Sequence, residues 1–148
     1  AIYTDDTWSP VISPGFNFCY YGNTFSSLLM GSNSAITFDI SRAGQGSGYS
    51  ISATTGAIPN TTYAPNMIFG PYHDINPNLA SANKKIEWRV EGTAPKRRFI
   101  ASYNDMPYFG SSCTPSFRKP TRNRLRTSAL SRTRKSRTFR HPTGLTAA

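Results

Sequence analysis

The chain has 148 residues and a formal net charge of +10, with seven acidic and seventeen basic side chains. No apolar run reaches the roughly 18 residues of a membrane-spanning helix, so the sequence predicts no such helix. All seven acids and seven of the bases lie at or before Cys113, and the remaining ten bases follow it. The charge excess therefore belongs to the last 35 residues and is no evidence about the function of the first 113.

The aromatic residues divide the chain at the same place, because only Phe117 and Phe139 follow Cys113. Residues 1–113 are therefore predicted to form a β-sandwich domain. Residues 114–148 form a basic tail rich in Arg, Ser, Thr and Pro, which we expect to be disordered because it buries too little apolar surface. The chain has neither an initial Met nor a leader, which predicts a processed or excised piece.

In the first part of the chain, apolar side chains recur at every second position, as they do in β-strands. In residues 16–21 the side chains of Phe16, Phe18 and Tyr20 share one face. A turn at residues 22–23, a strand at 26–30, a turn at 31–34 and a strand at 35–38 complete a predicted meander. No convincing helix is predicted anywhere in the chain.

Residues 40–66 are rich in Gly, Ser, Thr, Asn and Pro and predict a long connection. A strand is expected at residues 67–69. The cleanest alternation follows at 85–91, where Ile86, Trp88 and Val90 face one side, so Trp88 is expected in the core. A turn at residues 92–95 and a strand at 98–103 complete a hairpin.

These elements predict an all-β fold, an antiparallel β-sandwich of jelly-roll or Ig-like type. Six or seven strands can be counted, fewer than such sandwiches usually contain, so an incomplete sandwich is also compatible with the sequence. Cys19 and Cys113 could form a disulfide, whose long loop would contribute about 4 to 5 kcal/mol. Two free thiols are equally compatible.

Catalytic chemistry has few candidate residues. His73 and His141 are the only histidines, and the glycines of residues 44–48 match neither a nucleophile elbow nor a dinucleotide fingerprint. The sequence therefore predicts that the protein is not an enzyme. A hydrolase using His73 and Asp74 remains an alternative.

A calcium site is a possible interpretation of residues 74–78, where Asp74, Asn76 and Asn78 supply oxygen ligands at alternate positions. The glycine and glutamate of a complete EF-hand loop are missing, and the same residues are ordinary turn formers. If calcium binds, Asp5 and Asp6 are the expected helpers from elsewhere in the chain. Apart from calcium, no cofactor is predicted.

Aromatic side chains could form a sugar-binding platform, since their flat faces carry polar groups. Tyr21 and Tyr72 are the ligand-binding candidates, and Tyr21 is expected to be exposed because it lies opposite Phe16 and Phe18. The aromatic residues that could contribute also include Trp8, Tyr20, Tyr49, Tyr63 and Trp88. Burial in the core is the alternative for each of them.

The basic tail supports a different interpretation, in which the protein binds nucleic acid non-specifically through phosphates. No recognition motif accompanies the charge, and a solvated tail is the alternative. The residues concerned are Arg118, Lys119, Arg122, Arg124, Arg126, Arg132, Arg134, Lys135, Arg137 and Arg140.

Four segments, taken in order, resemble a β-rich domain of large secreted surface proteins of the Bacteroidota. They are residues 15–23 (GFNFCYYGN), 31–38 (GSNSAITF), 70–77 (GPYHDINP) and 92–100 (GTAPKRRFI). Such proteins often carry PKD-type repeats and a C-terminal gliding or sorting module. The resemblance implies a non-catalytic extracellular or cell-surface module, adhesive or structural, whose partners are surface glycans or other protein domains.

The chain departs from that family at two places. Ser34 stands where the family usually has Gly, so the turn is expected to need another conformation. After Cys113 the family continues with apolar strands, whereas this chain becomes rich in Arg. Either the reading frame is shifted there, or the basic extension is genuine; a shift would expose an unpaired sheet edge and reduce solubility.

Overall fold

The structure is a computed structural model that describes residues 2–49, 57–79 and 82–110 and the backbone of residues 124–125. It is built from antiparallel strands, which confirms the predicted all-β class. The one helical element in these ranges is a 3₁₀ turn, η1 (Ile40–Arg42), whose N-cap Asp39 accepts a hydrogen bond from the Ser41 N–H. None of the described residues forms a helix long and apolar enough to cross a membrane.

The first strands form a tight hairpin. β1 (Phe18–Tyr20) pairs with β2 (Asn23–Phe25), and Tyr21 and Gly22 make the two-residue turn. Both turn residues have positive φ, +46° and +80°, as a type I′ turn requires. Tyr21 is 87% exposed at the tip, which confirms the exposure predicted for it.

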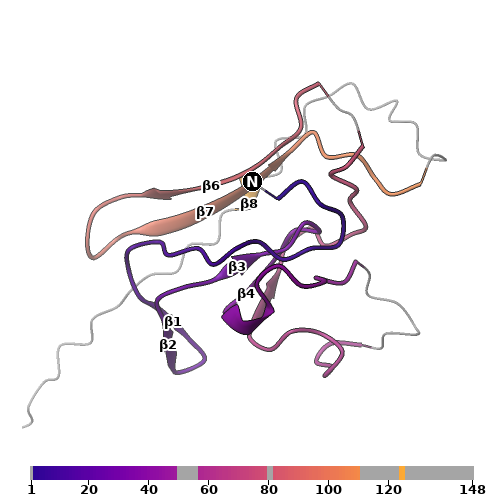
Figure 1. The fold of residues 1–148 in the computed structure, drawn as a ribbon. Helices are drawn as coiled ribbons and strands as arrows, with labels where there is room; N and C mark the ends of the chain where they lie inside the picture. Colours follow the sequence, from indigo (N-terminus) through magenta and orange to yellow (C-terminus); the bar gives the residue numbers. More distant parts are fainter. Residues whose placement is uncertain (1, 50–56, 80–81, 111–123, 126–148) are drawn as a thin grey trace, which may run out of the picture.

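The remaining strands form two three-stranded sheets. β3 (Leu29–Met30), β4 (Ala35–Thr37) and β5 (Met67–Phe69) form one sheet in that order. β6 (Lys85–Glu91) and β7 (Arg98–Asn104) form a long hairpin, which β8 (Arg124–Leu125) extends. Figure 1 shows the β6–β7 hairpin lying along the layer that contains β3 and β4.

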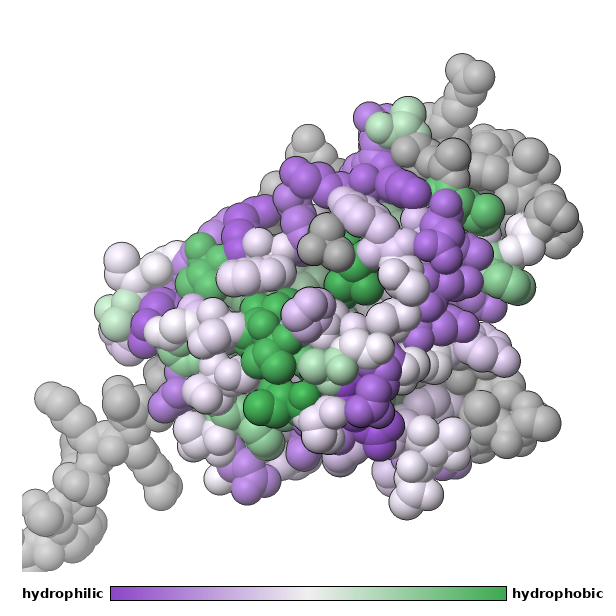
Figure 2. All heavy atoms as spheres, in the orientation of Figure 1, coloured by the Kyte–Doolittle hydropathy of each residue, from purple (hydrophilic) through white to green (hydrophobic). Residues whose placement is uncertain are grey.

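The main core lies between these layers, because its buried side chains come from both. Phe18 from β1 meets Phe99 from β7 edge to face, with ring centroids 6.5 Å apart. Around them pack Leu28, Met30 and Ile36. Figure 2 shows one face of the molecule, where apolar side chains gather near the middle and hydrophilic ones surround them.

The prediction that Trp88 belongs to the core is wrong. Its neighbour on the same face, Ile86, is buried, but Trp88 is 44% exposed. One side of the indole stacks on Phe99 with centroids 5.6 Å apart, and the other stays open. Alternation assigns a side chain to a face of the sheet, but it does not determine how far the opposite layer extends over that face.

Two residues of the predicted tail, in β8, pair with β7 through Ala101↔Leu125 and Ser102↔Arg124. The other residues of the tail, and Cys113, lie outside the described residues. The domain boundary, the expected disorder, the shifted reading frame and the disulfide therefore stay predictions. Cys19 is exposed, and among the described residues it has no disulfide partner.

The expectation that Ser34 needs a different turn conformation is wrong. Its φ of +65° is the left-handed conformation that glycine favours. Ser34 is buried, and its carbonyl accepts a hydrogen bond from the Gly70 N–H, which links the turn to the end of β5. A serine therefore occupies the turn at the cost of backbone strain.

Replacing Ser34 with Gly should raise the free energy of unfolding, because the left-handed conformation costs a residue with a β-carbon about 1 to 2 kcal/mol. We expect Ser34→Gly to be more stable than the matched Ser34→Ala by about 1 kcal/mol in urea unfolding. Equal midpoints for the two variants would show that the turn stores no such strain.

Candidate functional site

Asn33 joins three separate segments of the chain. Its side chain is fully buried, and its Nδ2 donates hydrogen bonds to Asp6 Oδ1 at 2.7 Å and to the Gly48 carbonyl at 2.8 Å. Its Oδ1 accepts a third bond from the Ile75 N–H at 2.8 Å. The N-terminal segment, the loop at residues 46–48 and the segment around Ile75 are therefore held around one amide.

This arrangement brings three carboxylates together. Asp5, Asp6 and Asp74 can each offer one oxygen, and these oxygens all lie within 4.8 Å of one another. The backbone supports the group, because the Asp6 carbonyl accepts from the Ser47 N–H and the Asp74 carbonyl accepts from the Phe109 N–H. The approach of Asp5 and Asp6 to Asp74, which the sequence could only suggest, is present in the structure.

Three oxygens in and beside this acidic group are buried and have no hydrogen-bond partner among the described residues: Asp5 Oδ1, Asp74 Oδ1 and the Tyr72 hydroxyl. Burial raises the pKa of Asp5 and of Asp74, and the charges of the neighbouring carboxylates raise both further. Burial also raises the pKa of Tyr72 to about 12. Buried oxygens without partners destabilise the fold unless something else binds them.

The raised pKa values of Asp5 and Asp74 determine how the stability of the fold changes with pH. A carboxyl whose pKa is higher in the folded chain than in the unfolded chain binds its proton more tightly when folded. The contribution of Asp5 and Asp74 to stability is therefore lost as the pH rises from the usual Asp value through their raised pKa. A cation bound to the group would reverse this loss, because it favours the charged carboxylates.

A hard cation fits the spacing of the three oxygens. Calcium binds carboxylate oxygens at about 2.3 to 2.6 Å, so two ligands on opposite sides of one ion are about 5 Å apart. Of the residues predicted from the sequence, Asp74 joins the acidic group. Asn76 Oδ1 accepts from the Asn78 N–H at 2.9 Å in its own turn, and Asn78 is exposed.

A lysine side chain contacts the carbonyl groups of that turn. Lys84 Nζ donates to the Pro77 carbonyl at 2.7 Å and to the Leu79 carbonyl at 2.8 Å. These hydrogen bonds stabilise the turn and give two of its carbonyls a donor. The acidic group, rather than the turn of residues 74–78, therefore gathers the oxygens that could hold a metal.

The side chain of His73 contacts a backbone carbonyl and an aromatic ring. Its Nδ1 lies 2.6 Å from the Pro71 carbonyl, and its ring packs against Tyr108 with centroids 4.7 Å apart. Asp74, the neighbouring residue, points its carboxylate into the acidic group instead.

The two tyrosines predicted to bind a ligand belong to different parts of the structure. Tyr21 contacts Tyr20, which packs against the main core, with ring centroids 4.7 Å apart. Tyr72 packs against Phe69 in a second cluster with Trp8, Leu29 and Ala64. The structure does not bring Tyr21 and Tyr72 into one platform.

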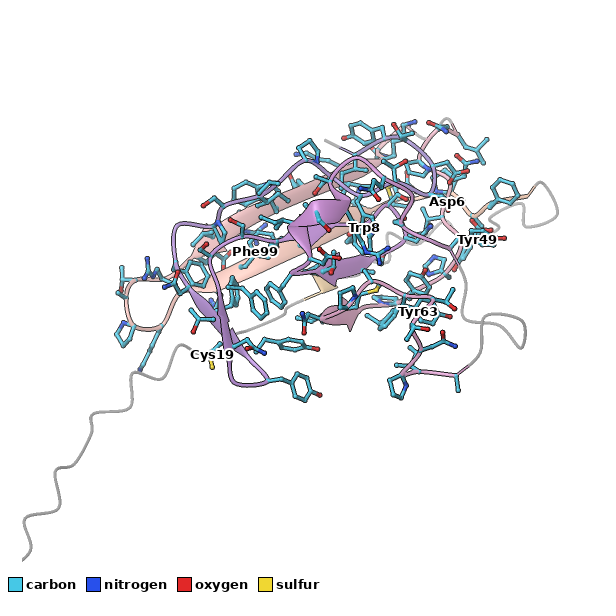
Figure 3. The ribbon with its side chains drawn as sticks, turned by 60° about the horizontal axis from the view of Figure 1, so that its bottom comes forward. Asp6, Trp8, Cys19, Tyr49, Tyr63 and Phe99 are labelled. Carbon is cyan, nitrogen blue, oxygen red and sulfur yellow. The ribbon has the colours of Figure 1, made fainter. Side chains whose placement is uncertain are left out.

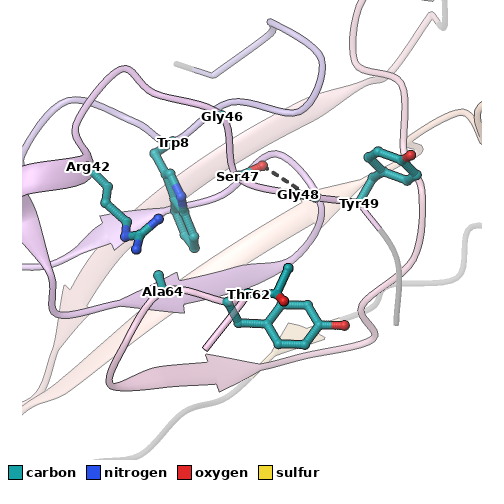
Figure 4. Close-up of a pocket in the computed structure, with 9 residues that line it drawn as sticks. Trp8, Arg42, Gly46, Ser47, Gly48, Tyr49, Thr62 and Ala64 are labelled. Atoms are coloured by element: carbon teal, nitrogen blue, oxygen red, sulfur yellow. Dashed lines mark hydrogen bonds between the residues drawn. The ribbon is translucent and has the colours of Figure 1, made fainter. Parts of the chain in front are cut away.

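A pocket of about 130 Å³ lies next to the second cluster. Figure 3 shows Asp6, Trp8, Tyr49 and Tyr63 toward one end of the molecule, away from Cys19. In Figure 4 Arg42 and Trp8 are drawn toward one side of the pocket and Tyr49 toward the other. The lining residues are Trp8, Arg42, Gly46, Ser47, Gly48, Tyr49, Thr62, Tyr63 and Ala64.

Sequence reasoning found only part of this pocket. Trp8, Tyr49 and Tyr63 were among the possible platform residues, but nothing in their spacing placed them together. Nothing in the sequence indicated that Arg42 would lie at a binding site. The one local signal was the Gly-rich stretch at residues 44–48, in which Gly44 and Gly48 have positive φ, +74° and +68°. The Trp8 N–H donates to the Gln45 carbonyl of this stretch at 2.8 Å.

The fold and these sites define an all-β domain whose loops, rather than its sheets, carry the candidate chemistry. Residues 1–118 match the NIDO-related family, and the chain belongs to that family, an extracellular-type domain family. No curated protein matches the chain. No solved structure matches it either. The family is of the extracellular type that the sequence resemblance implied, whereas the location of this chain and the Bacteroidota, gliding and PKD associations stay predictions.

Truncating Asn33 should destabilise the protein strongly, because it leaves the buried Ile75 N–H without its acceptor and removes the bonds to Asp6 and Gly48. We expect Asn33→Ala to lower the free energy of unfolding by about 3 kcal/mol. The matched control is Asn23→Ala at the exposed hairpin, expected to cost less than about 0.5 kcal/mol. Urea unfolding measures both; similar losses would contradict the linking role of Asn33.

Proposed function

We propose that this chain is a non-catalytic adhesive or structural module of a secreted or cell-surface protein, which binds a surface glycan or a neighbouring protein domain. The observation that carries the proposal is the family match over residues 1–118, which spans the strands β1 to β7. Such a module acts through its loops and exposed side chains, and the aromatic pocket provides a surface of that kind.

The non-catalytic part of the proposal is supported by the surroundings of the one described histidine. His73 contacts a backbone carbonyl and a tyrosine ring, and Asp74 belongs to the acidic group. A nucleophile with an adjacent base is the arrangement that acyl transfer needs. Among the described residues, the contacts of His73 are with the Pro71 carbonyl and the Tyr108 ring rather than with a serine or a cysteine.

Binding to nucleic acid through the tail is the alternative, and deletion of residues 114–148 separates the two. We expect the shortened chain to keep any binding to a surface-glycan array, because the pocket and the acidic group lie before residue 114. Salt-sensitive retention on DNA–cellulose should be lost, since phosphate contacts need the tail's charge. The reverse pattern would establish the tail as the functional part.

The same glycan array also tests whether the protein has enzymatic activity on the glycans that it binds. We expect the bound glycans to be recovered chemically unchanged, as measured by mass spectrometry after long incubation. A cleavage product that disappears in a His73→Ala variant would overturn the non-catalytic proposal.

A calcium ion held by Asp5, Asp6 and Asp74 is a second proposed feature of this module. The three clustered carboxylates and the buried oxygens without partners support it. The ion would connect the N-terminal segment to the segment after β5, adding to what Asn33 already holds. Its role would be structural, because it would stabilise the loops at the pocket's end of the domain.

Replacing Asp74 with Asn should have opposite effects with and without calcium. In EDTA at pH 7 the variant should melt a few degrees higher, because one repelling charge is gone. In millimolar CaCl₂ the parent chain should gain stability and Asp74→Asn should gain little. Asp105→Asn, which lies outside the acidic group, is the control and should respond to calcium as the parent does.

The proposed calcium site fails if CaCl₂ leaves the melting temperature of the parent chain unchanged. It also fails if Asp74→Asn and the parent chain gain equally. Magnesium in place of calcium tests the size of the site, since magnesium demands shorter bonds and a stricter octahedron.

A further inference from the structure

We propose that the pocket lined by Trp8, Arg42 and Tyr63 binds a single acidic sugar residue of a glycan, with Arg42 holding its carboxylate. The inference rests on the proposed glycan-binding function and names the site and the class of sugar. It differs from the sequence-based expectation, which pointed to Tyr21 and Tyr72.

The size of the pocket limits the ligand. At about 130 Å³ it is smaller than the sites of about 300 to 1,000 Å³ that enclose drug-sized molecules. One six-membered ring with its substituents is a suitable occupant, whereas a longer chain would have to continue outside. A terminal or branching sugar fits this description.

The aromatic wall is rigid before any ligand arrives. Trp8 is only 2% exposed and packs with Leu29, Ala35 and Ala64. Tyr63 meets Phe69 edge to face with centroids 5.6 Å apart. Trp8 is therefore a fixed, buried base of the pocket, and the more exposed rings of Tyr63 and Tyr49 are the ones that can contact a sugar ring.

Charge selects an acidic sugar. Arg42 is the one charged residue among those that line the pocket. Its Nε donates to Asp39 Oδ2 at 3.0 Å, and Asp39 is itself held by the Ser41 N–H and hydroxyl. A guanidinium has five N–H donors, so the Asp39 contact leaves its two terminal nitrogens to bind a second carboxylate.

The ion pair with Asp39 also positions the guanidinium. Hydrogen bonds from Ser41, and then from Arg42, hold the pKa of Asp39 below its usual value, so Asp39 is charged at neutral pH. The carboxylate of Asp6 is turned to the buried Asn33 amide. Arg42 is therefore fixed in place, and Asp6 Oδ1 is bonded to Asn33 rather than to Arg42.

Polar groups at the pocket can bind the sugar hydroxyls. The Ser47 hydroxyl donates to the Gly48 carbonyl at 3.2 Å and keeps its own lone pairs as acceptors (Figure 4). Thr62 is exposed, and Tyr49 is 51% exposed. A mixture of aromatic faces and hydroxyls is the chemistry that a sugar ring needs.

The test is a titration of the isotope-labelled full chain with D-glucuronate, D-galacturonate and N-acetylneuraminate, followed by NMR. We expect at least one acidic sugar to shift the signals of Trp8 and Tyr49 with a dissociation constant of about 1 mM, typical of a single sugar and one charged contact. Methyl glucoside, which has no carboxylate, should bind at least about tenfold more weakly.

Variants identify the residue responsible. Arg42→Gln should weaken binding of the acidic sugar at least about tenfold, because it removes the charged donor. Arg89→Gln is the matched control, since it removes a guanidinium of β6 that pairs with Glu91 and does not line the pocket, and it should keep the affinity of the parent chain. Tyr49→Ala should weaken binding, and the exposed Tyr21→Ala should not.

Two results would overturn the inference: none of the three acidic sugars shifts the lining residues, or Arg42→Gln binds them as well as the parent chain. The array distinguishes this failure from that of the proposed function. Glycan binding that survives Arg42→Gln and Tyr49→Ala would keep the function and reject this pocket. An array without any bound glycan would reject glycan binding itself.

Discussion

The buried amide of Asn33 is the constraint on which the loop end of this protein depends. It binds Asp6, the Gly48 carbonyl and the Ile75 N–H at once, and these groups lie far apart in the sequence. A fully buried amide with its donors and acceptor satisfied specifies one arrangement, because any other leaves polar groups without partners. The acidic group and one wall of the pocket both follow from that arrangement.

The two candidate sites share the segment at residues 45–48 and have opposite electrostatics. On one side, Asp5, Asp6 and Asp74 repel one another and include buried oxygens without partners. On the other side, Arg42 is the charged group at an aromatic pocket. A cation in the acidic group would stabilise the same loop that borders the pocket, so proposed metal binding and proposed sugar binding would support each other.

Strands were predictable because alternation is local. The hairpin of β6 and β7 was expected from Ile86, Val90 and Phe99, and the structure places it almost residue for residue. The prediction that Trp88 is buried was wrong because its burial depends on how far the opposite layer extends. The prediction for the turn at Ser34 was wrong because the expected glycine does not show whether a serine can adopt a positive φ. Ser34 adopts one here.

The sequence by itself determined the class of the fold and the division of charge, because alternating side chains, turn residues and charges act through near neighbours. It named Asp5, Asp6 and Asp74 as possible partners but could not show that they meet. Only the tertiary structure decided that meeting, the separation of Tyr21 from Tyr72, and the pairing of Arg42 with the aromatic pocket. Each depends on contacts between segments distant in the chain, and Asn33, a residue for which the sequence predicted no such role, holds several of those segments together.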